Sequence, residues 1–209
     1  MLDWITQHSD MLSLATNMTM VVIWLVYLQV FLAGFRRQTQ PKIVINRAAG
    51  SGLDAACFVS NMSSDSIYLE SVLTTVRAGS ENWEQCVTDF EVIDERERPN
   101  DPRQRTHQGP LHPGDYTSIG SFQSLIERVT RTRKGPAPKD LLARAEPIEI
   151  EIMIIADHSS DDLLIGARRT FSIVRDDQGV TISPDTAHTR QIRSRRQRKA
   201  IQQIIMDQT

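Results

Sequence analysis

An uncharged apolar run near the N-terminus constrains this chain more than any other feature. From Met11 to Phe35 the sequence contains no Asp, Glu, Lys or Arg, and residues 20–28 present no polar face at helical spacing. A helix of this length extends roughly 37 Å, whereas the hydrocarbon core of a bilayer needs about 20 helical residues. We therefore predict a transmembrane helix over residues 11–37, preceded by an extracytoplasmic N-terminus of residues 1–10.

The flanks of this run indicate an anchor that is retained in the mature protein. A cleaved export signal begins with basic residues and ends at a small-residue cleavage site. Here the leading segment carries Asp3 and Asp10 and no Lys or Arg. The only pair of small residues, Ala33-Gly34, precedes Phe35 and two arginines. The sequence thus predicts an uncleaved signal-anchor.

Basic residues after the helix predict its orientation. Four of them precede the first acidic residue of this region, Asp54, and they are Arg36, Arg37, Lys42 and Arg47. Lys and Arg close to a membrane helix remain on the cytoplasmic side, and aromatic residues collect at both interfaces. We expect the N-terminus outside with Trp4 in the outer interface, Phe35 in the inner one, and the remaining chain in the cytoplasm, as in a bacterial inner-membrane protein.

Polar residues within the run allow two roles for its outer half. Ser13, Thr16 and Asn17 lie close together on a helix, and Gln29 lies deeper. Such side chains can hydrogen-bond between helices and would then favour a homo-oligomer. Alternatively, the hydroxyl groups bond to their own backbone and the outer half is interfacial.

Residues 42–184, after the linker of residues 38–41, are typical of a β-domain. Apolar residues alternate with polar ones in several runs, which is the pattern of half-buried strands. The expected strands cover residues 42–46, 55–62, 66–76, 83–93, 147–155, 163–174 and 180–183. We expect residues 55–62 and 66–76 to form a hairpin. About seven strands separated by turns favour an antiparallel, immunoglobulin-like β-sandwich.

Two insertions interrupt the strand pattern. Residues 94–115 are charged and broken by prolines, which predicts a mobile loop. Residues 121–133 place apolar residues at positions i, i+3, i+4 and i+7 after Ser121, a good N-cap residue. We therefore expect a short amphipathic helix there.

A glycine pattern resembles a dinucleotide-binding fingerprint but lacks its context. Gly50, Gly52 and Ala55 match G-x-G-x-x-A, and Glu70 follows at a suitable distance. The fingerprint requires a helix directly after the glycines, whereas residues 56–62 are typical of a strand. We predict a flexible strand connection and no cofactor.

Cysteines, histidines and acids give no standard catalytic or metal pattern. Cys57 and Cys86 are expected to be free thiols, because a cytoplasmic domain is in a reducing compartment. Metal ligands could come from two sets, His107 with His112, and the group Asp157, His158, Asp161 and Asp162. Neither spacing fits a known site, so we predict no metal.

Two adjacent arginines, Arg168 and Arg169, lie within an expected strand. Alternation sends neighbouring side chains to opposite faces, so one of the two faces inward or contacts a partner. We expect either a salt bridge to Glu149 or Glu151, or a ligand-binding role.

The C-terminal segment, residues 185–209, concentrates positive charge. Residues 189–208 lack Gly and Pro, which predicts an amphipathic helix that carries Arg190, Arg193, Arg195, Arg196, Arg198 and Lys199. Without residues 185–209 the chain has 18 basic against 24 acidic residues. The basic segment fits anionic lipid head groups, an acidic protein or, less well, nucleic acid. A solvated tail is the remaining alternative.

The plan of one N-terminal helix and a cytoplasmic β-domain resembles that of many bacterial inner-membrane proteins. This resemblance carries no functional residues. We expect a non-enzymatic, single-pass membrane protein whose β-domain is an interaction or scaffold module, such as an accessory subunit of a membrane complex. The alternatives are a membrane-tethered enzyme or small-ligand sensor that uses Arg168, Arg169 or the histidine loop, and a nucleic-acid binder.

Overall fold

The computed structural model describes residues 9–38, 40–48, 50–89, 106–144, 146–158, 163–176 and 179–208. The chain divides into two compact units, Met1–Gln40 and Pro41–Thr209. We describe each unit by itself.

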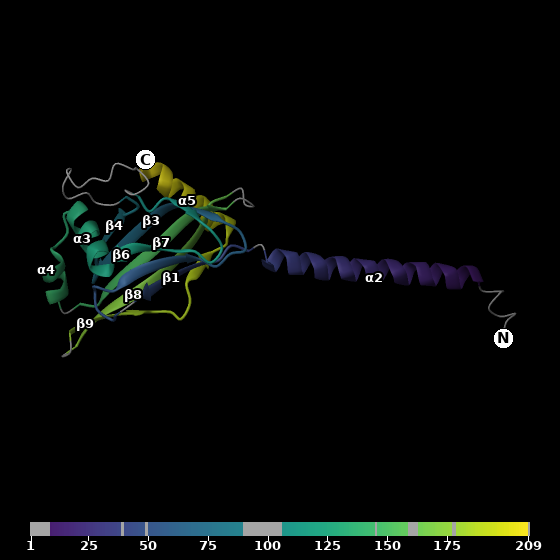
Figure 1. Cartoon of the computed structure of the whole chain (residues 1–209), viewed down its shortest axis with the longest axis horizontal. Coiled ribbons are helices and arrows are strands. Elements are labelled where there is room, and N and C mark those ends of the chain that lie inside the picture. Colours follow the sequence, from purple (N-terminus) through teal and green to yellow (C-terminus); the bar gives the residue numbers. More distant parts are fainter. Residues whose placement is uncertain are drawn as a thin grey trace. The chain divides into compact units, whose positions relative to one another are not determined.

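The described part of the first unit is formed by helix α2 (Ser9–Gln38), drawn in purple in Figure 1. The part from Ser9 to Phe35 is long and apolar enough to cross a membrane, and none of its most apolar window is buried within the chain. The hydroxyl groups of Thr16 and Thr19 donate hydrogen bonds to the carbonyls four residues earlier, both at 2.8 Å. The predicted apolar helix is therefore confirmed, and these hydroxyls bond to their own backbone.

The second unit is mainly β, with two antiparallel sheets (Figure 1). The small sheet has the order β1-β2-β6, formed by β1 (Ile43–Ala48), β2 (Ala56–Asn61) and β6 (Tyr116–Ser121). The large sheet is built on three long strands in the order β8-β7-β3: β8 (Ile165–Asp176), β7 (Ile148–His158) and β3 (Ile67–Ala78). Its short edge strands are β4 (Glu81–Cys86), β5 (Gly109–Leu111), β9 (Gly179–Pro184) and β10 (Arg190–Ile192).

The main core lies between the small sheet and one face of the large sheet. Strand β7 supplies Ile148, Ile150 and Ile152 to it, as the alternating pattern predicts. Helix α3 (Phe122–Thr132) closes the core, and the ring of Phe122 packs 4.8 Å from that of Phe171. The side chain of Ser121 caps α3, so this prediction is confirmed. A short helix, α4 (Pro138–Ala143), follows and was not expected.

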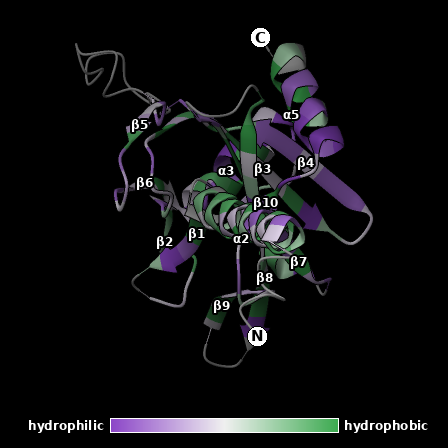
Figure 2. Ribbon diagram, turned by 90° about the vertical axis from the view of Figure 1, so that its right-hand side faces the viewer, coloured by the Kyte–Doolittle hydropathy of each residue, from purple (hydrophilic) through white to green (hydrophobic). Residues whose placement is uncertain are grey.

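The opposite face of the large sheet is partly covered by the C-terminal helix α5 (Arg195–Gln208). A second apolar cluster forms there from Ile155, Ile192 and Ile201, with Ile205 packed against it. Gly166 of β8 permits the close approach, because an added Cβ would lie 2.8 Å from the Cδ1 atom of Ile201. Figure 2 shows hydrophilic and hydrophobic bands alternating along α5.

The predicted hairpin of residues 55–62 and 66–76 is wrong. Strand β2 pairs with β1 and β6, whereas β3 pairs with β4, β5 and β7. The turn between them carries the chain from one sheet to the other. The buried side chain of Asn61 stabilises this turn, because it donates hydrogen bonds to the carbonyls of Asp65 (2.9 Å) and Leu111 (2.8 Å). These bonds replace the strand pairing that a hairpin would provide.

Three further features of the fold differ from the predictions. The described residues form ten strands rather than about seven. Strand β5 lies within the predicted loop of residues 94–115, most of which (94–105) lies outside the described residues. The C-terminal helix begins at Arg195 rather than at residue 189, because residues 190–192 pair with β8 as strand β10.

Candidate interaction surface

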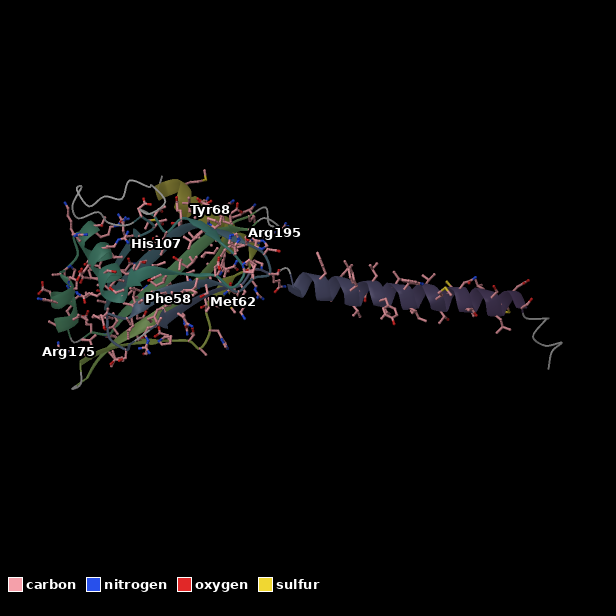
Figure 3. All side chains as sticks on the ribbon, viewed as in Figure 1. Phe58, Met62, Tyr68, His107, Arg175 and Arg195 are labelled. Atoms are coloured by element: carbon pink, nitrogen blue, oxygen red, sulfur yellow. The ribbon has the colours of Figure 1, made fainter. Side chains whose placement is uncertain are left out.

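The C-terminal segment carries a group of exposed cations, which we call the basic surface. It consists of the exposed side chains of Arg190, Arg193, Arg195, Arg196 and Lys199. Arg195 is labelled in Figure 3, at the end of the second unit that also carries Met62 and away from Arg175. Within the described residues no carboxylate forms an ion pair with any of these five cations. Their charge is therefore available to an external anion.

Arg198, the sixth cation of this segment, has a structural role. Its guanidinium donates hydrogen bonds to the carbonyls of Leu163 (2.6 Å) and Leu164 (2.8 Å), and its side chain is half-buried. Charge-assisted bonds of this kind fix the start of α5 against the residues just before β8. The sequence pattern groups Arg198 with the other arginines, but the structure separates it from them.

The apolar side of α5 is occupied within the chain. Ile201 is buried in the second apolar cluster, and Ile205 packs against it. Ser194 caps the helix, because its hydroxyl oxygen accepts a hydrogen bond from the backbone N–H of Gln197 at 3.2 Å. Docking therefore holds the helix with its cations outward, and the apolar stripe is not free to insert elsewhere.

Strand β10 also attaches the basic surface to the first strand of the second unit. The side chain of Gln191 receives a hydrogen bond from the N–H of Ile43 (3.1 Å) and donates one to its carbonyl (2.6 Å). The hydroxyl of Thr189 accepts from the N–H of Ile45 at 2.9 Å. The basic surface therefore begins beside Ile43, which follows the last residue of α2, Gln38, by five residues.

Arg169, predicted to bind a ligand or an acid, bonds instead to three backbone carbonyls and one side-chain amide of the same chain. Its buried guanidinium donates hydrogen bonds to the carbonyls of Ile45 (2.7 Å), Thr186 (3.0 Å) and Ala187 (3.3 Å), and to Oδ1 of Asn46 (2.5 Å). Burial lowers the pKa of this guanidinium from its ordinary value. It therefore joins β8, β1 and the segment before β10, and the prediction that one of the two arginines faces inward is confirmed.

Arg168 lies on the opposite face of β8 and is half-buried. It is directly opposite Arg190 in the antiparallel ladder, so it extends the basic surface along the large sheet. The expected salt bridge to Glu149 or Glu151 is made instead by Arg77, at 3.9 Å and 3.3 Å. Neither Arg168 nor Arg169 contributes to it.

The two histidines of the predicted loop are in different environments. His107 is buried, and burial together with the charge of Arg128 lowers its pKa to about 4. His112 is exposed, and its Nδ1 atom lies 2.9 Å from the hydroxyl of Ser66. The described residues contain no group of three potential metal ligands. Asp161 and Asp162 lie outside the described residues, so the second predicted ligand set is only partly described.

The cysteines are free thiols in separate sheets. Cys57 is buried in the main core, where desolvation raises its pKa to about 12 despite the charge of Arg169. Cys86 is half-buried, with its sulfur 2.9 Å from the hydroxyl of Thr88 and 3.2 Å from that of Ser71. The glycine pattern near Gly52 leads through a turn into strand β2, so the helix of a dinucleotide fingerprint is not formed there.

The residues predicted to determine the membrane orientation lie in different parts of the fold. Arg36 and Arg37 belong to α2, and Phe35 in the same helix is exposed. Lys42 is exposed, while the half-buried Arg47 donates a hydrogen bond from its guanidinium to the carbonyl of Ile182 at 2.6 Å. Trp4 lies outside the described residues.

Sequence reasoning missed Thr189 and Gln191, which fix the basic surface beside β1. Their roles depend on side-chain bonds to a strand 144–148 residues earlier in the chain. No local pattern signals such bonds. Comparison of the chain with family models, with curated proteins and with solved structures gave no match.

Proposed function

We propose that this chain is a single-pass membrane protein of the bacterial inner membrane type, whose cytoplasmic β-domain is a non-enzymatic interaction module. The observation that carries the proposal is α2, a helix of membrane-spanning length whose apolar side chains are exposed on all sides. Such a helix is stable where its surroundings are apolar and its backbone is internally bonded. The basic residues that follow it support an orientation with the N-terminus outside.

The proposed role of an interaction module rests on which polar side chains are bonded within the chain and which are exposed without an ion pair. Arg169, one of the two arginines predicted as ligand contacts, donates hydrogen bonds to backbone carbonyls, and the two loop histidines differ in burial and in contacts. The exposed cations of the basic surface, in contrast, have no ion pair within the described residues. This distribution favours recognition of an external surface over small-ligand chemistry. A membrane anchor raises the effective concentration of the domain near such a surface.

An immunoglobulin-like architecture remains a prediction of this proposal. It is supported by a three-stranded sheet that shares a core with one face of a larger antiparallel sheet. Helix α3, which closes the same core, is an addition to a simple sandwich. An experimental structure whose strand order departs from that of immunoglobulin domains would reject this part alone.

Crosslinking in intact membranes, followed by identification of the partner, tests the proposal. Deleting residues 186–209 is a poor control, because it would uncover Ile155 and remove the bonds that Gln191 makes to β1. We would compare instead the variants R193Q/R195Q/R196Q and K134Q/K139Q/R175Q, which each remove three exposed cations. We expect a crosslinked complex that the first variant weakens and the second retains.

Three results would contradict the proposed function. The first is a solitary monomer that crosslinks to no component of the membrane. The second is a C-terminal reporter fusion that is active only outside the cytoplasm. Extraction of the chain from membranes by alkaline carbonate would also reject an integral anchor.

A further inference from the structure

We infer that the basic surface binds the acidic phospholipid head groups of the same bilayer that α2 spans, and so holds the β-domain against the membrane in one orientation. This inference rests on the proposed function, since it requires α2 in a membrane and the β-domain on the side of the anionic lipid. It adds to that function a defined partner, an anionic lipid surface, and the residues that contact it.

The first argument is the length of the tether. Ile43 follows Gln38 by five residues, and an extended chain covers at most about 3.6 Å per residue. Ile43 therefore remains within about 18 Å of the helix end, whatever the relative orientation of the two units. Gln191 bonds to Ile43 through both of its side-chain polar atoms. The basic surface, which starts at the neighbouring Arg190, is kept close to the bilayer by covalent connection.

The second argument is charge. The basic surface holds five exposed cations, and no described carboxylate forms an ion pair with them. Without residues 185–209 the chain has an excess of six acidic residues, 24 against 18. An anionic membrane therefore repels most of the β-domain and attracts this one part. Each Lys or Arg near an anionic surface contributes about 1 kcal/mol to the free energy of binding. The five cations together are therefore enough to favour one orientation of the β-domain.

The third argument is the use of the apolar residues of α5. An amphipathic helix that inserts into a bilayer presents its apolar side to the lipid. Here Ile201 and Ile205 face Ile155 and Ile192 on the large sheet. The helix therefore offers cations to the membrane, while Ile201 and Ile205 are already packed within the chain. Binding through it is electrostatic, at head-group level, and sensitive to salt.

The test uses the full chain in lipid nanodiscs. A fluorophore is attached at A200C in a C86S background, because Ala200 is exposed on α5 and Cys57 is fully buried. Nanodiscs of phosphatidylcholine, with or without about 30% phosphatidylglycerol, carry the same fraction of a lipid with a nitroxide on its head group. Nitroxide quenching of the fluorophore reports contact between α5 and the head groups.

We expect quenching to be several-fold stronger with phosphatidylglycerol and to fall to the neutral-lipid value near 1 M salt, where the screening length is about 3 Å. R193Q/R195Q/R196Q should weaken the lipid-bound orientation roughly 10²-fold, since three contributions are lost. R193K/R195K/R196K should restore it, and K134Q/K139Q/R175Q should leave it unchanged.

Equal quenching in both lipids, in a chain that resists carbonate extraction, would overturn this inference and leave the proposed function intact. Carbonate extraction of the chain would instead remove the proposed function. Salt-sensitive capture of a single-stranded RNA oligonucleotide by the same three arginines, with equal quenching in both lipids, would overturn the inference in favour of nucleic acid.

Discussion

Helices α2 and α5 both carry apolar residues, but these residues differ in their exposure. In α2 the apolar side chains are exposed around the whole helix, whereas in α5 Ile201 is buried against the large sheet. The first helix requires an apolar environment that the described chain does not supply. The second has its buried isoleucine packed within the chain, and its exposed residues include the cations Arg195, Arg196 and Lys199. We propose a membrane for α2 and not for α5 because its apolar residues are exposed, and not because of their number alone.

The largest expected effect comes from giving α2 the charge that α5 carries. The variant L25R/L28R places two arginines near the centre of the apolar run, each costing about 2.5–3.5 kcal/mol in membrane insertion. We expect most of the protein to lose resistance to carbonate extraction. The matched control L25I/L28I keeps the apolar surface and should remain in the membrane. Unchanged resistance of the arginine variant would show that α2 is not held by the hydrocarbon core.

A smaller effect is expected from removing the apolar anchor of α5. Ile201→Ala deletes the side chain that is 3% exposed at the centre of the second cluster. Loss of such a side chain costs about 2–4 kcal/mol. Hydrogen exchange should become faster in α5 while the main core keeps its protection. Met206→Ala, at a position that is 77% exposed, should change the free energy of unfolding by less than about 0.5 kcal/mol.

The contact between α5 and the large sheet can also be disturbed by adding volume on the sheet. Gly166→Val adds side-chain volume where a Cβ alone would lie 2.8 Å from Ile201 and 3.2 Å from Ile192. Overpacking of this kind costs about 1–3 kcal/mol. A lower thermal midpoint together with faster exchange in α5 is expected. Thr170→Val on the same face of β8 is the control, and an equal loss there would contradict a specific contact with α5.

The smallest effect separates the arginines of α5 from one another. Arg198→Met removes the bonds to the carbonyls of Leu163 and Leu164, which should cost about 1 kcal/mol for a half-buried charged donor. Arg195→Met removes an exposed cation and should alter stability by less than about 0.5 kcal/mol. Chemical denaturation of both variants measures the difference. Equal losses would mean that Arg195 also has a structural partner.

The parts of the fold that were predictable have strong local signals. The absence of charge over 25 residues fixes α2, and strict alternation fixes the buried isoleucines of β7. The spacing of Phe122, Leu125 and Val129 fixes α3, since all three face the core. These elements depend on periodicity alone, which a single sequence displays.

The parts that were missed depend on distant partners. The turn after β2 looks like a hairpin locally, but the buried amide of Asn61 bonds to the carbonyl of Leu111 and directs the chain into the other sheet. Arg190, Gln191 and Ile192 read as the start of a helix, yet pairing with β8 makes them a strand. The cations of the basic surface were identified by charge. The sequence could not separate the exposed cations from the structural Arg198, because that difference depends on how α5 docks on the large sheet.

The bonds from Thr189 and Gln191 to β1 have a consequence for how copies of this protein behave when crowded. Strand β1 is at the edge of the small sheet, and an open edge is a template for pairing with another chain. Side chains rather than a neighbouring strand occupy the polar groups of Ile43 and Ile45 along that edge. Under the proposed membrane anchor, copies are confined to a plane and meet often, and these side chains close one route by which such meetings would lead to aggregation.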